Sequence, residues 1–401
     1  MSLNDTPRSE RVQIGFFGKR NAGKSSVLNA VCGQPLAVVS DVLGTTTDPV
    51  LKSMEILPLG PVVLIDTPGI DDSGELGKLR VQKAESTLDR VDIAVLVTSA
   101  PGPLDEYEKE LIHKFEAKKI RHITAYNKSD LLENVPEPKE GEIYISAKTG
   151  AGIFELKEMI AALMPQGSKK QLAGDLVPEG SVCILVTPID AGAPKGRMIL
   201  PQQMVLRDLL DHDRMALVVK PMQLKSALSA LISPPGLVIT DSQAFKEVAS
   251  ILPADTALTS FSILMARYKG FLETAVKGAA ALKELKDGDR VLICEGCTHH
   301  RQCDDIGTIK LPRWIGQYTK KEIKFEFTSG IGYKDKLEGY SLIVHCGGCM
   351  LSDKQILSRM QAAVTAGVPF TNYGTVIALI NGVLGRSIAM IDELKEQRRK
   401  L

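Results

Sequence analysis

The sequence predicts an α/β protein built from three domains. From Val12 to about Pro165, short β-rich runs alternate with helical patterns, an order that is typical of a parallel sheet flanked by helices. The stretch 165–180, rich in Gly, Pro and Lys, interrupts the apolar pattern and predicts a linker. Two further segments with strand and helix patterns follow it. A chain of 401 residues is also longer than one ordinary core supports.

Each domain is predicted from its own run of elements, and we place the domains at residues 1–168, 169–265 and 266–401. The first has expected strands at 12–18, 62–69, 93–99, 122–128 and 142–148. The second combines strands at 181–190, 215–220 and 236–240 with helices at 224–232 and 245–252. The third combines strands at 290–294, 324–329 and 340–346 with helices at 271–285 and 350–367. Because the second domain carries no phosphate loop, acid–base pair or ligand cluster, we expect it to serve in subunit contact.

The charge balance excludes one broad class of partner. With 49 Lys and Arg residues against 48 Asp and Glu residues, no whole-protein field would draw the chain to nucleic acid or to an anionic membrane. Residues 1–11 are polar and charged, and no apolar run reaches the roughly 18 residues that a membrane span needs. We therefore expect a cytoplasmic protein that binds neither nucleic acid nor a membrane.

The seven cysteines are unevenly distributed. An odd count without a secretory signal argues against a disulfide framework. Cys32 and Cys183 lie among apolar neighbours and are expected to be small buried hydrophobic side chains. The other five cysteines fall between positions 294 and 349, a clustering that indicates a metal or redox centre.

A phosphate-binding loop follows the first strand. Residues 18–25 read GKRNAGKS, a GxxxxGKS pattern with a helical stretch behind it. Backbone N–H groups of such a loop point at phosphate oxygens, and the helix N-terminus adds partial positive charge. Lys24 is expected to reach the β- and γ-phosphates as a catalytic residue, and Ser25 to bind Mg²⁺. The nucleotide-binding residues predicted in this loop are Asn21, Ala22, Gly23, Lys24, Ser25 and Ser26.

Three later motifs, each at a strand end, identify the nucleotide as GTP. Asp66 and Gly69 bound a DxxG segment, whose carboxylate acts on the Mg²⁺ sphere and whose glycine N–H senses the γ-phosphate. The Asp130 carboxylate can accept from guanine N1–H and the 2-amino group, whereas adenine offers an acceptor at N1. The order of the motifs predicts a P-loop GTPase fold that binds GTP and Mg²⁺. The nucleotide-binding residues predicted here are Asp66, Gly69, Asn127, Lys128, Asp130, Ser146, Ala147 and Lys148.

The first domain resembles the translation-factor-related GTPases, and within them the tRNA-modifying and ribosome-assembly branch (TrmE/Era-like). Residues 44–48 read GTTTD, and Thr46 matches the switch threonine that binds Mg²⁺ in that branch, so it is a second expected catalytic residue. Thr47 departs from the arginine of the branch. Ile70 stands where Ras-like enzymes carry a water-orienting glutamine, so slow hydrolysis is expected. Asn21 matches the asparagine that helps hold K⁺ in potassium-activated members, with a plain turn-forming role as the alternative.

Two strand ends carry the cysteine chemistry. Residues 294–300 read CEGCTHH and residues 345–349 read HCGGC, and ligands at the C-terminal ends of neighbouring parallel strands converge. One interpretation is a tetrahedral zinc site on Cys294, Cys297, Cys346 and Cys349. The other is a [4Fe–4S] cluster on the last three of these, with a weaker fourth ligand. The strand position of Cys294 favours the cluster, because its side chain alternates away from its neighbours.

The whole chain resembles the HydF family of [FeFe]-hydrogenase maturation GTPases. The family hallmark is CxH, a long spacer and HCxxC, matched here at 297–299 and 345–349, and a GAPKGR…LPQ stretch ending at residue 202 adds to the resemblance. The resemblance implies a [4Fe–4S] cluster with one labile site. Its implied ligands are Cys297, Cys346 and Cys349, with His345 or His299 as candidates for the fourth position, while Cys294, Cys303 and His300 stay unassigned.

The resemblance also implies a scaffold or carrier function. Such a protein receives a diiron precursor from two radical-SAM maturases and delivers it to the apo-[FeFe]-hydrogenase, as a homodimer formed through its middle domain. A ribosome- or tRNA-associated GTPase with a C-terminal zinc module is an alternative, which the near-neutral composition and the lack of an interleaved Arg/aromatic stretch disfavour. A redox enzyme is a third function, and it lacks a second cofactor motif.

Overall fold

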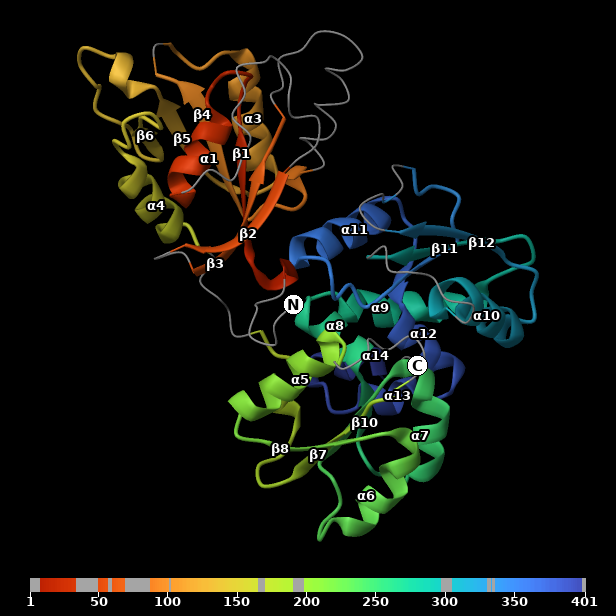
Figure 1. Cartoon of the computed structure of the whole chain (residues 1–401). Coiled ribbons are helices and arrows are strands. Elements are labelled where there is room, and N and C mark those ends of the chain that lie inside the picture. The colour runs from red at the N-terminus through yellow and green to blue at the C-terminus, as the bar shows by residue number, and fades with distance from the viewer. Residues whose placement is uncertain are drawn as a thin grey trace. The chain divides into compact units, whose positions relative to one another are not determined.

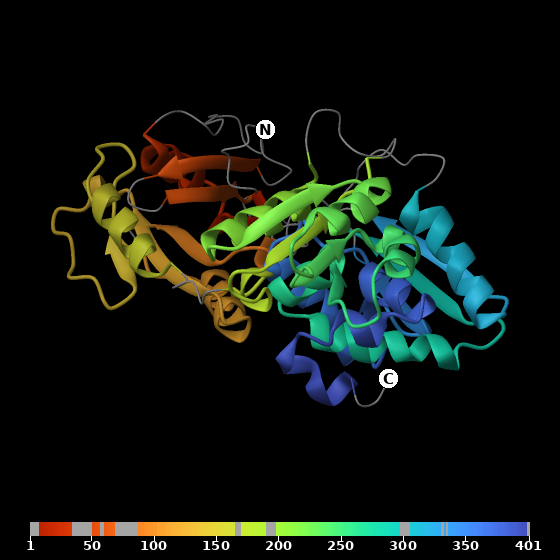
Figure 2. The ribbon, with the colours of Figure 1, turned by 90° about the horizontal axis from the view of Figure 1, so that it is seen from below.

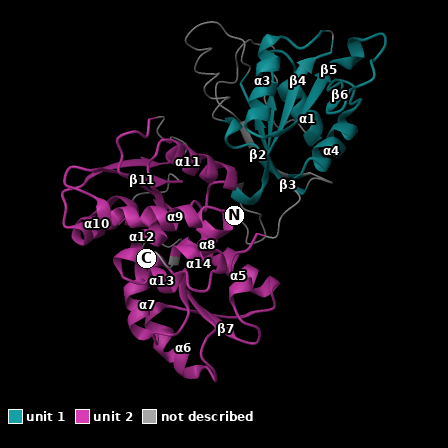
Figure 3. Cartoon of the chain, turned by 180° about the vertical axis from the view of Figure 1, so that it is seen from behind, with its two compact units in different colours: residues 1–167 teal, residues 168–401 magenta. Residues whose placement is uncertain are grey.

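The computed structural model of the chain forms two compact units, residues 1–167 and residues 168–401 (Figures 1 and 3). The structure describes residues 8–33, 50–56, 60–68, 87–100, 102–164, 170–189, 198–296, 305–329, 333 and 336–398. Both units are α/β, and three separate sheets carry all the strands of the described chain. This confirms the predicted fold class. Within the described residues, no helix is long and apolar enough to cross a membrane.

The N-terminal unit contains a six-stranded sheet in the order β2-β3-β1-β4-β5-β6. Its strands are β1 Val12–Phe17, β2 Val50–Ile56, β3 Gly60–Asp66, β4 Ile93–Ser99, β5 Arg121–Asn127 and β6 Glu142–Tyr144. Five strands are parallel, as predicted, with β1 pairing with both β3 and β4. The edge strand β2 was not predicted, and it runs antiparallel to β3. Its sequence is of mixed composition, so only its pairing with β3 identifies it as a strand.

Helices cover both faces of this sheet. They are α1 Lys24–Cys32, α3 Glu106–Ala117 and α4 Ile153–Ala162. Along β1, Phe16 packs with the apolar side chains of α1 and α4, whereas Phe17 packs with those of α3. This alternation follows from the two-residue period of a strand. The sheet is therefore buried on both sides, and its functional residues lie at the strand ends.

The C-terminal unit contains two four-stranded parallel sheets. The first has the order β10-β9-β7-β8, with β7 Val182–Val186, β8 Met215–Val219, β9 Leu237–Thr240 and β10 Leu258–Ser260. The second has the order β12-β11-β13-β14, with β11 Arg290–Glu295, β12 Lys324–Ser329, β13 Leu342–His345 and β14 Phe370–Asn372. The strands β10 and β14 were not predicted, because three residues are too few for a periodic pattern.

The two sheets share one hydrophobic core, to which β7 and β9 contribute alongside β11 and β13. Helix α8 contacts β10 of the first sheet and β14 of the second, and α12 packs against α8 and against β13 and β14 (Figure 1). Figure 2 shows the same unit from below. The helices of this unit are α5 Leu200–Asp211, α6 Leu224–Ala230, α7 Phe245–Ile251, α8 Phe261–Tyr268, α9 Leu272–Ala279, α10 Leu311–Thr319, α11 Asp353–Thr365, α12 Tyr373–Ile380, α13 Leu384–Ser387 and α14 Lys395–Arg398. Those absent from the prediction are α5, α8, α10, α12, α13 and α14.

Short 3₁₀-helices complete the elements of the described residues. They are η1 Arg8–Glu10, η2 Ser129–Leu131, η3 Gly174–Leu176, η4 Pro221–Gln223, η5 Ser242–Ala244, η6 Ala280–Glu284 and η8 Asp392–Leu394. One further element, η7 Ile306–Lys310, is a π-helix. Short π-helices are rare and occur often at functional sites.

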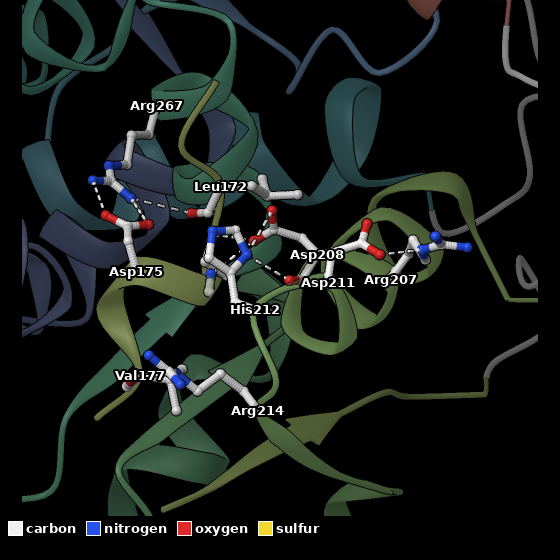
Figure 4. A network of polar contacts seen from close by, with 11 residues as sticks. Leu172, Asp175, Val177, Arg207, Asp208, Asp211, His212, Arg214 and Arg267 are labelled. Atoms are coloured by element: carbon white, nitrogen blue, oxygen red, sulfur yellow. Dashed lines mark hydrogen bonds and ion pairs between the residues drawn. The ribbon is translucent and has the colours of Figure 1, made fainter. Parts of the chain in front are cut away.

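A polar network attaches the start of the C-terminal unit to its helices (Figure 4). The Arg267 guanidinium of α8 makes two hydrogen bonds to Asp175, at 2.8 and 2.7 Å, and a third to Glu393 at 3.0 Å. The Asp208 carboxylate of α5 accepts from the backbone N–H groups of Ala173 and Gly174, at 2.8 and 2.7 Å. Ala173, Gly174 and Asp175 lie within the stretch 165–180 predicted as a linker, so the second half of that stretch is fixed to α5 and α8.

Candidate functional site: the nucleotide site and the cysteine edge

The phosphate loop connects β1 to α1, and two of its glycines cannot carry a side chain. Gly18 has a φ of +141°, and a Cβ there would lie 2.1 Å from the carbonyl oxygen of Val97. Gly23 has a φ of +90°, and a Cβ there would lie 2.3 Å from Asn127 Nδ2. Asn21 also has a left-handed backbone, with a φ of +61°. The loop therefore packs tightly against β4 and β5, which fixes the backbone N–H groups around the phosphate position.

A hydroxyl and a carboxylate lie side by side at the start of α1. The Ser25 hydroxyl donates to Asp66 Oδ2 at 2.6 Å, while Asp66 Oδ1 is buried and has no hydrogen-bond partner among the described residues. Burial raises the pKa of Asp66, and the bond from Ser25 and the charge of Lys24 oppose that rise. An unsatisfied carboxylate oxygen beside a serine hydroxyl fits Mg²⁺, which prefers hard oxygen ligands. The buried Lys24 ammonium donates to the Lys19 carbonyl at 2.7 Å.

Asn127 joins the phosphate loop to the SAK loop. Its Nδ2 donates to the Ala22 carbonyl at 3.0 Å, and its Oδ1 accepts from the Ala147 N–H at 3.0 Å. The Ser146 hydroxyl donates to Asp130 Oδ1 at 2.7 Å, which orients the carboxylate expected to read guanine. Asn127 was predicted as a nucleotide-binding residue, and the structure gives it the further task of holding two nucleotide loops together.

The predicted nucleotide residues within the described chain converge on one edge of the sheet. They follow β1, β3, β5 and β6, whose carboxyl ends meet there because these strands are parallel. Ser26 lies on α1, and Lys148 is exposed in the SAK loop. Four residues of this site named from the sequence, Thr46, Thr47, Gly69 and Ile70, lie outside the described residues.

The cysteine motif lies at the carboxyl edge of the second C-terminal sheet. In the register of β11, β13 and β14, Cys294 pairs with His345 and His345 pairs with Asn372. The residues that directly follow these three are Glu295, Cys346 and Tyr373, respectively. We call this row of three residues the cysteine edge.

Backbone donors surround the thiol of Cys346. The Sγ atom accepts from the N–H of Gly296 at 3.1 Å and of Gly348 at 3.4 Å. Burial raises the pKa of Cys346, and these two backbone bonds lower it. Hydrogen bonds to sulfur are typical of cysteines that bind iron–sulfur clusters. Gly296 directly precedes Cys297, which lies outside the described residues together with His299, His300 and Cys303.

His345 is fully buried, and both of its ring nitrogens are engaged. Nδ1 donates to the Cys346 carbonyl at 2.9 Å, so Nε2 is the acceptor for Arg359 Nη1 at 2.9 Å. Burial, with the Arg359 charge added, lowers the pKa of His345 to about 3, so the ring is neutral. In this arrangement His345 orients the motif and leaves no ring nitrogen for a metal.

Three residues at this edge were missed from the sequence. They are Glu295, which is buried beside Cys346 and raises the pKa of that thiol, Arg359 of α11, and Tyr373 of α12. The sequence offered no signal for Arg359 or Tyr373, since neither belongs to a spaced motif. Glu295, between two cysteines, could have been found.

The remaining cysteines of the described residues differ in burial. Cys294 is buried within β11, as its strand position predicted, and Cys349 is half-buried just after Cys346. Cys183 is fully buried with its pKa raised to about 12, and Cys32 is half-buried with its pKa raised to about 11. Burial is the main cause in both, so these thiols are inert, as expected for hydrophobic side chains. Among the described residues, no three His, Cys, Asp or Glu side chains are placed to hold a metal ion.

Family models match three consecutive parts of the chain. The model of the 50S ribosome-binding GTPase matches residues 13–128. The model of the Hydrogen maturase F dimerization domain matches residues 172–270, and that of the Hydrogen maturase F tetramerization domain matches residues 273–390. These two matches support oligomerisation of the chain.

Individual relatives match about two-fifths of the chain. The tRNA modification GTPase MnmE of Bordetella petrii is 32% identical over 155 residues, which are 38% of this chain and 34% of that protein. MnmE of Clostridioides difficile is 34% identical over 181 residues, 42% of this chain and 39% of that protein. The chain thus spans little more than a third of the length of these relatives. A crystal structure of Era in complex with MgGDPNP and nucleotides 1506-1542 of 16S ribosomal RNA has a TM-score of only 0.35 at 19% identity, over 52% of this chain and 91% of that chain.

The relatives named above are GTPases that match about two-fifths of the chain. The two family models behind the GTPase model are those of hydrogen maturase F, and they cover most of the second unit. A GTPase domain that continues into both of these domains identifies the chain as a member of the hydrogen maturase F (HydF) family.

Proposed function

We propose that this chain hydrolyses GTP, holds a [4Fe–4S] cluster and carries a diiron precursor from two radical-SAM maturases to the apo-[FeFe]-hydrogenase. The observation that carries the proposal is the union of a GTPase domain with two hydrogen maturase F domains in one chain. In this proposal residues 1–168 bind and hydrolyse GTP, residues 169–265 form a dimer, and residues 266–401 hold the cluster.

The cluster ligands in this proposal are Cys297, Cys346 and Cys349. Cys346 supports it through the two backbone donors at its sulfur, which stabilise the anionic thiolate state. Bound there, a cluster with three thiolates supplies one iron whose fourth ligand can exchange for the cargo. Since both ring nitrogens of His345 are engaged, we assign that labile position to Glu295 or His299 rather than to His345.

In the nucleotide site, each residue has a task that follows from its contacts. Lys24 places a buried positive charge beside the phosphates, and Ser25 with Thr46 binds Mg²⁺. Asp130 accepts from the guanine edge. Hydrolysis is slow in this proposal because Ile70 cannot orient a water, and K⁺ at Asn21 accelerates it.

The dimer forms in this proposal through β8. This strand lies at the end of its sheet, and its side chains Met215 and Val218 are 52% and 40% exposed. Leu210 and Met222, close to it in sequence, are exposed as well. An apolar strand edge is a template for pairing with another chain, and here the second copy is the partner that covers it.

The ribosome- or tRNA-associated alternative is not favoured. It would require a zinc module that grips RNA behind the GTPase domain, whereas the region behind that domain matches hydrogen maturase F domains throughout 172–270 and 273–390.

Anaerobic reconstitution with iron and sulfide tests the proposal. We expect a brown protein with broad absorption near 400 nm that bleaches in air, and about four irons per chain by metal analysis, as the [4Fe–4S] formula requires. Replacing Cys297, Cys346 or Cys349 by Ser should deplete the iron and stop hydrogenase activation, while GTP hydrolysis stays near wild type. Cys294→Ser is the matched control and should retain the iron. A colourless protein that binds zinc on all four cysteines would refute the cluster assignment.

A further inference from the structure

The hydroxyl of Tyr373 is buried but makes no hydrogen bond within the described residues. The residue as a whole is 9% exposed. A buried polar group that makes no hydrogen bond destabilises the fold, so folded proteins rarely leave one unless something else binds it. The orphaned hydroxyl of Tyr373 therefore points to a ligand.

The sheet register puts Tyr373 next to the proposed cluster ligands. Tyr373 opens α12 directly after β14, and β14 pairs with β13, which ends at His345 just before Cys346. Tyr373 is thus the third member of the cysteine edge, beside Cys346 and in line with Glu295. Burial raises the pKa of Tyr373 well above its ordinary value, and Cys346 and Glu295 add to this rise, as expected for acidic neighbours.

The π-helix η7 packs a glycine against this hydroxyl. Gly307 lies within it, and a Cβ on Gly307 would meet the Tyr373 hydroxyl at 2.4 Å and Glu295 Oε1 at 2.6 Å. The Tyr373 hydroxyl and the Glu295 carboxylate oxygen therefore both pack against Gly307, and any residue with a Cβ at this position would collide with them. This arrangement places an unused donor beside Glu295, one of the two residues to which the proposed function assigns the labile position.

We propose that Tyr373 is a binding residue of the cysteine edge, whose hydroxyl donates a hydrogen bond to an anionic group bound at the exchangeable iron. This inference rests on the proposed function. It adds the residue that stabilises the exchangeable ligand, whether that ligand is the carboxylate of the resting protein or an anionic group of the cargo. A hydrogen bond to a charged acceptor is worth more than one between neutral groups.

The test compares Tyr373→Phe with wild type and with Tyr340→Phe, using reconstituted full-length protein. Tyr340 is a matched control, because it is also buried but its hydroxyl already donates to Glu326 Oε2 at 2.7 Å. Cyanide serves as the anionic probe, and its binding to the dithionite-reduced cluster is followed by electron paramagnetic resonance while iron content is monitored. We expect Tyr373→Phe to keep the wild-type iron content and to bind cyanide on the order of ten times more weakly, about 1.4 kcal/mol. Tyr340→Phe should bind it as wild type does.

A second measurement separates a binding role from a structural one. Because the hydroxyl makes no bond within the described fold, Tyr373→Phe should leave the melting temperature of the cluster-free protein unchanged or raised. Unchanged cyanide affinity, a loss of iron or a lowered melting temperature in this variant would each overturn the inference. If wild-type protein takes up no cluster at all, the proposed function fails first, and that failure is visible before any variant is made.

Discussion

Lys269 provides a quantitative test of how the loop with Cys346 and Cys349 is held. This lysine follows α8 and is 1% exposed, and its ammonium donates to the Leu351 carbonyl at 2.9 Å and to Asp353 Oδ1 at 3.2 Å. Leu351 and Asp353 connect the HCGGC motif to α11. The loop that carries two proposed cluster ligands is therefore attached to the end of α8 through the buried charge of Lys269.

The cost of removing this charge follows from its contacts. Lys269→Met keeps most of the apolar stem and removes the ammonium, which leaves the Leu351 carbonyl without its donor. A hydrogen bond from a charged group contributes about 1.5–3 kcal/mol. Asp353 adds little to that sum, because it is partly exposed and keeps its ion pair with Lys170 at 2.5 Å. We expect a loss of about 2 kcal/mol in the local stability of the loop.

Native-state hydrogen exchange of the full chain measures this loss in peptides that cover residues 342–365. A change of about 2 kcal/mol corresponds to roughly 30-fold faster exchange. Lys277→Met is the control, because its ion pair with Glu273 at 2.7 Å lies on the helix surface and contributes only about 0.3–0.5 kcal/mol. Less than threefold faster exchange in Lys269→Met would refute the argument, and so would an equal effect in the control.

Three further predictions concern the nucleotide and the dimer. Asp130→Asn should shift the preference from GTP to xanthosine triphosphate, because the amide presents a donor where guanine needs an acceptor; competition binding measures this, and retained GTP selectivity contradicts it. Hydrolysis should run several-fold faster in KCl than in NaCl, and Asn21→Ala should abolish that difference; equal rates in wild type would remove the K⁺ site. Val218→Lys on β8 should give monomers by analytical ultracentrifugation at micromolar concentration, whereas Val135→Lys, which alters an exposed valine of the GTPase unit, should not. An unchanged oligomer in Val218→Lys would place the contact elsewhere.

For the first domain, the sequence predicted all five parallel strands and the nucleotide motifs. Its strands are long, buried on both faces and followed directly by motifs such as GKS and NKSD, so their period and their chemistry point to the same sheet edge. The sequence also placed Cys294 inside a strand, because alternation along β11 separates it from the residues beyond the strand end. The edge strand β2 could not be predicted, since its pairing depends on a partner and not on its own pattern.

By itself, then, the sequence determined the α/β class, the nucleotide motifs and the spacing of the cysteine motif, because these are local patterns of hydrophobicity and residue type. Only the tertiary structure decided what surrounds those motifs. It gave Asn127 the bonds that join two loops, engaged both ring nitrogens of His345, and put Tyr373 beside Cys346. Each of these contacts joins residues from different elements, and the register of a parallel sheet and the packing of a shared core are set by the whole chain.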